Sequence, residues 1–171
     1  HKAVVLYGPR QVGKTTLCKE VLRQLNLKTL SINADEKRYH DALSSRDERT
    51  LLELVEGYEL LFIDEAQRIP DIGINLKILT DKAPRLKIIA TGSSSFELAN
   101  TISEPLTGRK WVFQLFPISQ LELKVHYNVF ELKSQLEERL IFGAYPELFS
   151  LPRREDKKEY LQQLAEDYLF K

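Results

Sequence analysis

Short apolar runs alternate with segments of helical periodicity along most of the chain. The runs are nearly continuous in apolar residues, which is typical of strands that are buried on both faces of a parallel sheet. The expected strands cover residues 3–7, 27–32, 59–65 and 86–91. The expected helices cover residues 14–25, 46–55 and 72–79. Strands that alternate with helices predict right-handed crossovers and an α/β fold with helices on both faces of the sheet.

The pattern changes toward the C-terminus. One more strand is expected at 110–115, and the rest is mostly helical, with residues 132–142 and 157–170 the clearest segments. We therefore divide the chain into a core of residues 1–116 and a mostly helical lid and linker of residues 117–171. The chain begins without a methionine and at the edge of a strand, so we expect flanking sequence to be missing.

Composition narrows the class of protein. A chain of 171 residues that is 43% hydrophobic can bury about two-thirds of the surface that the unfolded chain exposes, so it needs no disulfides or structural metal to fold. The 25 basic residues balance the 25 acidic ones, so net charge does not support nucleic acid as a partner. No apolar run approaches the ~20 residues of a membrane span, and no signal peptide is visible, so we expect a cytoplasmic protein. The single cysteine, Cys18, falls on the apolar face of the first helix and is expected to be buried and structural.

A phosphate-binding pattern, GxxxxGK[ST], opens directly after the first strand. Its residues are Gly8, Pro9, Arg10, Gln11, Val12, Gly13, Lys14 and Thr15, with Thr16 following. Glycine lets the backbone wrap closely around a phosphate and turn successive N–H groups toward it. The helix that follows aims its positive end at the anion. This segment predicts a binding site for a nucleoside triphosphate.

Two side chains of this segment have specific expected roles. Lys14 would place a compact positive charge between the β- and γ-phosphates. Thr15 would offer its hydroxyl to the Mg²⁺ ion that bridges them.

A second group of chemical residues ends the strand at 59–65. Asp64 and Glu65 follow a fully apolar run, so both side chains are expected at the ligand-bearing edge of a parallel sheet. We expect Asp64 to hold Mg²⁺ through water, and Glu65 to orient and deprotonate the attacking water. The alternative interpretation is a solvent-exposed acidic turn, and the phosphate loop earlier in the chain argues against it.

A third polar group, Thr91-Gly92-Ser93-Ser94-Ser95, follows the strand at 86–91. A small hydroxyl there is suited to bond the γ-phosphate or the attacking water, and Ser93 is the preferred residue. Serine is equally favoured as an N-cap or in a turn before residues 96–100, so both roles stay open.

Together these motifs resemble the bacterial and archaeal AAA-type P-loop ATPases that usually carry an uncharacterised C-terminal domain, relatives of the archaeal ATPases and the signal-transduction NTPases. The resemblance extends over nearly the whole chain. Its blocks, in family order, are residues 8–17, 63–67, 91–95, 106–109, 116–119 and 143–147.

The resemblance implies a three-layer P-loop NTPase fold of the additional-strand, AAA-like type, followed by a small helical lid. It places the strand at 86–91 between the phosphate-loop strand and the Asp64 strand. It also implies that a further domain begins shortly after Lys171, and that Ser93 or Ser94 is the first sensor.

Arg109 is the open question that the resemblance raises. In AAA-type machines a guanidinium contacts the γ-phosphate, often from a neighbouring subunit. Arg109 would then act in trans and require self-association. The alternative is a surface arginine that pairs with an acid such as Glu104.

The resulting hypothesis is a Mg-dependent ATPase domain that couples its nucleotide state to a conformational change, with the absent domain or another protein as partner. ATP rather than GTP rests on the resemblance, because no guanine-reading motif is visible. One alternative is a nucleotide-gated signalling switch with little turnover. A P-loop kinase is a further alternative, which the pair Asp64 and Glu65 disfavours because a water-activating acid would waste ATP.

Overall fold

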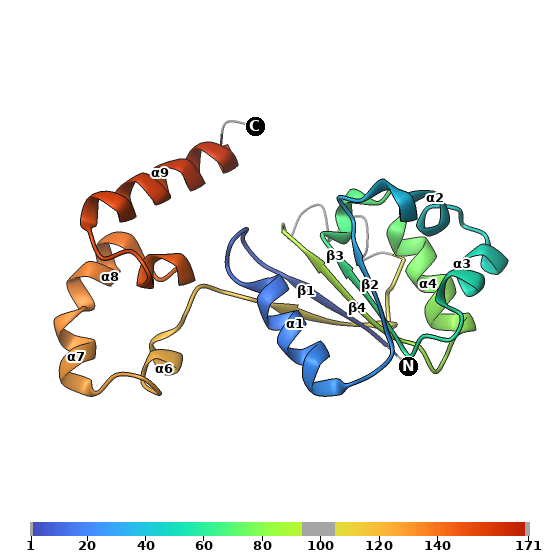
Figure 1. Cartoon of the computed structure of the whole chain (residues 1–171), viewed down its shortest axis with the longest axis horizontal. Coiled ribbons are helices and arrows are strands. Elements are labelled where there is room, and N and C mark those ends of the chain that lie inside the picture. The colour runs from blue at the N-terminus through green and yellow to red at the C-terminus, as the bar shows by residue number, and fades with distance from the viewer. Residues whose placement is uncertain (1, 94–104, 170–171) are drawn as a thin grey trace. The chain divides into compact units, whose positions relative to one another are not determined.

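The computed structural model describes residues 2–93 and 105–169 (Figure 1). Its centre is a five-stranded sheet in the order β2-β3-β4-β1-β5, and every neighbouring pair is parallel. The strands are β1 (Ala3–Tyr7), β2 (Thr29–Asn33), β3 (Leu60–Asp64), β4 (Lys87–Gly92) and β5 (Lys110–Gln114). The predicted α/β fold is confirmed, including the position of β4 between β1 and β3.

Three helices of the sheet region were predicted, and they are α1 (Lys14–Leu25), α3 (Glu48–Val55) and α4 (Ile72–Lys82). The described residues also form short helices that were not predicted, and they are η1 (Lys37–Tyr39), α2 (His40–Leu43) and η2 (Ala66–Arg68). The helix expected from Arg46 begins two residues later, because Arg46 has a left-handed φ of 55° and Asp47 acts as the N-cap. The Asp47 carboxylate accepts a hydrogen bond from the Thr50 amide at 2.8 Å, which fixes the first turn.

Two apolar clusters flank the sheet. The larger joins one face of the strands to α3 and α4, for example through Val5, Leu51 and Leu76. The smaller joins the other face to α1 through Leu6, Cys18 and Phe62. Figure 1 shows the same arrangement, with α1 on one side of the strands and α3 and α4 on the other. The expected burial of Cys18 is confirmed, since only 4% of the residue is exposed.

The strand β5 forms one edge of the sheet and is poorly covered. Trp111, Val112 and Phe113 remain 57%, 47% and 54% exposed, and the ammonium of Lys2 lies 4.2 Å from the Trp111 ring centre. On the α1 side of the sheet, Phe113 borders an apolar groove of about 300 Å³, which Leu17 and other residues of α1 also line.

Residues 116–171 form a second compact unit. Its elements are α6 (Gln120–Leu123), α7 (Val129–Ser134), α8 (Leu136–Phe142), η4 (Pro146–Phe149) and α9 (Arg154–Leu169). The expected single helix over 132–142 is wrong, because the chain contains two helices that meet at Gln135. Asn128 and Glu131 form a capping box that starts α7 before the expected position.

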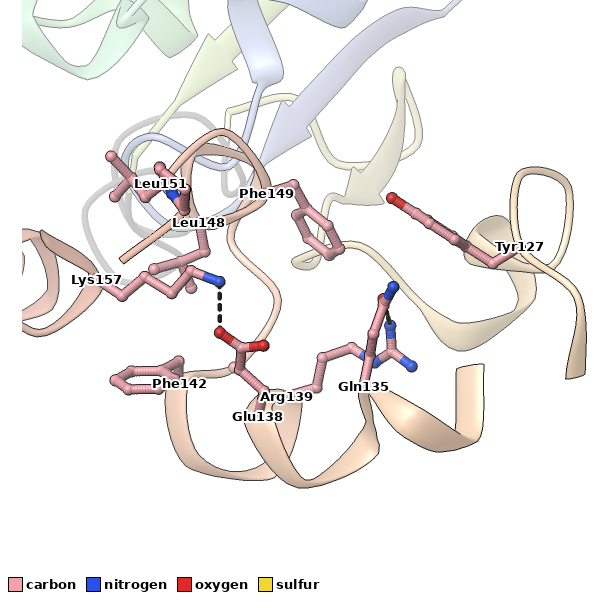
Figure 2. A pocket seen from close by; sticks show the side chains of 11 residues that line it. Tyr127, Gln135, Glu138, Arg139, Phe142, Leu148, Phe149, Leu151 and Lys157 are labelled. Atoms are coloured by element: carbon pink, nitrogen blue, oxygen red, sulfur yellow. Dashed lines mark hydrogen bonds and ion pairs between the residues drawn. The ribbon is translucent and has the colours of Figure 1, made fainter. Parts of the chain in front are cut away.

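A pocket of about 270 Å³ lies within this second unit (Figure 2). Lys157 on α9 donates to Glu138 on α8 at 2.7 Å, and the guanidinium of Arg139 donates to Gln135 at 2.8 Å. The charged groups of the pocket thus largely pair with neighbours in their own unit. Among the described residues, no helix has both the length and the apolar character needed to cross a bilayer.

Candidate functional site

The phosphate loop connects β1 to α1 and leaves the first turn of α1 free to bind an anion. Gly13 is the N-cap of α1 with φ 100°, a conformation that side chains disfavour, and it has no side chain to bond the first amides of the helix. Gln11 also has a positive φ, at 60°. Within the loop the side chain of Val12 is buried, whereas that of its neighbour Gln11 is exposed to solvent.

Gly8 is required for a reason that the sequence did not reveal. A Cβ at this position would lie 2.3 Å from the carbonyl oxygen of Leu115, the residue that follows β5. Leu115 is held there because its amide donates to the Tyr7 carbonyl at 2.8 Å. Glycine at position 8 therefore serves the packing of β5 against the loop as well as any approach to phosphate.

Lys14 is almost fully buried, with 5% exposed. Its ammonium donates to the carbonyl oxygens of Gly8 and Pro9 at 3.0 and 2.8 Å. Burial lowers the pKa of Lys14 below its ordinary value, while the carboxylates of Glu65 and Asp64 oppose that shift. The ammonium is thus already poised inside the loop, and anionic phosphate oxygens are stronger acceptors than the two carbonyls it now contacts.

Thr15, Asp64 and Thr91 are joined by hydrogen bonds at the carboxyl end of the sheet. The Thr15 hydroxyl donates to Asp64 Oδ2 at 2.7 Å, and the Thr91 hydroxyl donates to Asp64 Oδ1. Thr91 is fully buried, and its oxygen accepts a hydrogen bond from the Glu65 amide at 3.1 Å. Both oxygens of Asp64 are therefore oriented.

This donor set fits a magnesium ion. A threonine hydroxyl and a carboxylate are hard oxygen ligands, and Mg²⁺ commonly takes one or two protein oxygens and completes its shell with water and substrate phosphates. Within residues 2–93 and 105–169 no group of three or more His, Cys, Asp or Glu side chains offers a separate all-protein metal site. Thr15 and Asp64 lie together as the sequence predicted, in a geometry that suits an ion shared with a nucleotide.

Glu65, Gln67 and Ser93 form the second polar group of the site. Glu65 follows β3 with a left-handed φ of 54°. Gln67 Nε2 donates to Glu65 Oε2 at 2.6 Å and to Ser93 Oγ at 3.1 Å. Sequence reasoning had named Glu65 and Ser93 but had given no role to Gln67 or Thr91. Both residues are polar and lie within blocks of the family resemblance, Gln67 in 63–67 and Thr91 in 91–95, and this is the sequence signal that could have identified them. Ser94 lies outside the described residues.

Arg109 lies apart from these groups. It directly precedes β5, and its carbonyl accepts a hydrogen bond from the amide of Ala3 at the start of β1. Because β1 and β5 are parallel, Arg109 lies at the N-terminal ends of the strands, whereas the phosphate loop lies at their C-terminal ends. The guanidinium pairs with Asp81 on α4 at 2.6 Å. Asp81 replaces the suggested partner Glu104, which is outside the described residues.

Comparison with known proteins gives a consistent picture. The profile of a family described as an AAA domain matches residues 1–124. An uncharacterised protein of Mycobacterium tuberculosis is 34% identical over 160 residues, which cover 91% of this chain and 33% of that protein. An uncharacterised protein of Methanocaldococcus jannaschii is 27% identical over 185 residues, which cover 100% of this chain and 42% of that protein. The chain therefore spans less than half the length of these curated relatives.

Among solved structures, a mutant of RuvB from Thermotoga maritima is similar, with a TM-score of 0.51 and 19% sequence identity. The likeness covers 72% of this chain and 41% of the RuvB chain. At this identity the comparison shows the fold, which is that of a P-loop NTPase.

Proposed function

Because the chain belongs to the AAA domain family that its first 124 residues match, we propose that it binds ATP with Mg²⁺ and hydrolyses it. The observation that carries this proposal is the group formed by Lys14, Thr15, Asp64 and Glu65. These four side chains come from two segments that are far apart in the sequence and meet at the carboxyl end of β1 and β3.

Each residue has a distinct task in the proposed reaction. The Gly13 and α1 amides and the Lys14 ammonium would bind the β- and γ-phosphates. Thr15 and Asp64 would hold Mg²⁺, which supplies charge neutralisation at the phosphate oxygens. Water attacks the γ-phosphorus, and the bond from that phosphorus to the β–γ bridging oxygen breaks, giving ADP and phosphate. Glu65 would orient the water and accept its proton.

Arg109 has a role in this proposal only between two copies of the chain. Because it lies at the end of the strands away from the phosphate loop, a catalytic contact would have to be with the nucleotide of a neighbouring subunit, and the ion pair with Asp81 would have to open first. The Arg109→Ala variant is then expected to lower turnover while ATP affinity in the monomer is unchanged. Equal turnover and equal assembly of variant and wild type would refute this part of the proposal.

We further propose that the nucleotide state is passed to the parts of the protein beyond the sheet region. The second unit begins at Phe116, one residue after Leu115, which packs against Gly8 of the phosphate loop. A change in the loop therefore has a short covalent route to residues 116–171.

The decisive experiment measures Mg-ATP binding by calorimetry and phosphate release for wild type, Lys14→Ala and Glu65→Gln. We expect Lys14→Ala to lose binding and Glu65→Gln to bind without turnover. The exposed residues Lys19 and Glu56 offer matched controls, Lys19→Ala and Glu56→Gln, which should behave as wild type. Tight binding without turnover in wild type would instead favour a nucleotide-gated switch, and absence of binding would refute both.

A further inference from the structure

We propose that Gln67 is a positioning residue that holds the Glu65 carboxylate and links it to the hydroxyl of Ser93. The inference rests on the proposed ATPase function, in which Glu65 is the base, and it takes Ser93 as the sensor hydroxyl that faces the γ-phosphate. It adds a residue that connects the two.

The link is made by a single nitrogen atom. Gln67 Nε2 carries two hydrogens, so it donates at once to Glu65 Oε2 at 2.6 Å and to Ser93 Oγ at 3.1 Å. Glu65 follows β3 and Ser93 follows β4, and these strands are neighbours in the sheet. Gln67 therefore connects the residues that follow two neighbouring strands.

The bridge is set on a rigid base. Gln67 belongs to η2, which begins at Ala66 and is followed by Ile69, and both of these residues are fully buried. Ser93 is itself buried, with 7% exposed. A hydrogen bond from an amide to an ionised carboxylate is stronger than one between neutral groups. Gln67 thus restrains one carboxylate oxygen of Glu65 and leaves the other oxygen to receive a proton.

The remaining atom of the amide has an unused hydrogen-bonding capacity. Gln67 Oε1 is buried and accepts no hydrogen bond from the part of the chain that the structure describes. A buried carbonyl oxygen normally accepts at least one hydrogen bond. Water activated beside Glu65 is a donor of the required kind, so the amide is suited to contact the base, the sensor hydroxyl and the attacking water.

This arrangement predicts a relay from Ser93 through Gln67 to Glu65. When the Ser93 hydroxyl turns toward a γ-phosphate, its contact with Gln67 changes, and the carboxylate of Glu65 is reoriented. The expected consequence is that Gln67 affects the chemical step and leaves the binding of ATP unchanged.

The first test compares kcat, KM and ATP Kd for wild type, Gln67→Ala and Gln67→Asn. Gln67→Ala should lower kcat by about tenfold or more and leave Kd unchanged. General base catalysis supplies about 10²–10⁴-fold in rate, and a poorly positioned base loses part of that factor. Gln67→Asn retains the amide but is one methylene shorter, so it should recover only part of the loss. The matched control is Gln24→Ala, because the Gln24 amide also donates to a carboxylate, that of Glu20, at 2.8 Å, but on the exposed face of α1. It should not change kcat.

The second test asks whether the link to Ser93 matters. In a double-mutant cycle, Gln67→Ala and Ser93→Ala should be non-additive, so that the double variant is no slower than the slower single variant. Additive losses would overturn the relay. A weaker Kd and a lower Tm for Gln67→Ala with normal kcat would show a merely structural role, and would overturn the proposal as well.

A third measurement does not depend on turnover. The side-chain amide resonances of Gln67 should shift when a non-hydrolysable ATP analogue and Mg²⁺ are added to wild type, and should shift less in Ser93→Ala. An unchanged spectrum despite binding would overturn the relay alone. Failure of the wild type to bind nucleotide would refute the proposed function itself, which separates the two failures.

Discussion

The contact between Gly8 and Leu115 leads to a prediction that separates packing from phosphate binding. Replacing Gly8 by alanine adds a Cβ at 2.3 Å from the Leu115 carbonyl oxygen, whereas real Cβ contacts are essentially never below 3.0 Å. The backbone must therefore move by about 0.7 Å or more, which belongs to the overpacking changes that destabilise by about 1–3 kcal/mol. The neighbouring hydrogen bond from the Leu115 amide to Tyr7 opposes that movement.

We expect Gly8→Ala to lower Tm by about 2–12 °C, because each 1 kcal/mol corresponds to roughly 2–4 °C in a chain of this size. It should also weaken Mg-ATP binding, since the loop itself is displaced. Gly57→Ala is the control. Gly57 has a left-handed φ of 74°, and a Cβ there would have 3.4 Å to its nearest neighbour. Its expected loss is about 1–2 kcal/mol of backbone strain with no loss of affinity.

Thermal unfolding and calorimetric titration, both on the same protein preparations, measure the two effects. A Gly8→Ala chain that unfolds at the wild-type temperature and binds Mg-ATP normally would refute the argument. Loss of affinity without loss of stability would show that Gly8 serves the phosphate alone.

Three further predictions concern other parts of the molecule. Thr91→Val removes the buried hydroxyl that orients Asp64, so it should lower the free energy of unfolding by about 1–3 kcal/mol and weaken Mg-dependent ATP binding in a titration. Burial raises the pKa of the Cys18 thiol from 9.0 to about 11. The unfolded thiol therefore ionises first, so stability should fall as pH rises from about 8.5 toward 11, and urea unfolding should show a smaller fall for Cys18→Ala than for wild type. Asp81→Ala breaks an ion pair whose side chains are 40% and 38% exposed, so urea unfolding should show a loss below about 1 kcal/mol.

The sheet and the main chemical residues were predictable because each leaves a local signal. Continuous apolar runs marked the inner strands, and the pattern from Gly8 to Thr15 fixed the phosphate loop directly after β1. The acids at the end of β3 followed from the rule that parallel strands present ligand groups at their carboxyl ends. The order of the strands was not available from periodicity and came from the family resemblance.

What the sequence did not disclose depends on contacts between distant segments. The bridge from Gln67 to Ser93 and the orientation of Asp64 by Thr91 exist only once β3 and β4 are paired. The approach of Leu115 to Gly8 likewise requires β5 beside β1. The break at Gln135 was missed because apolar periodicity continues through the junction, whereas the capping box of α7 acts through backbone geometry that periodicity does not report.

The poorly covered edge strand has a consequence for handling the protein. In the described part of the chain β5 pairs only with β1, so its outer backbone groups are a template for another strand, and Trp111 and Phe113 add apolar surface beside them. The chain carries no formal net charge at pH 7, so long-range electrostatic repulsion does not keep the β5 strands of two molecules apart. Concentrated solutions near neutral pH therefore favour edge-to-edge aggregation.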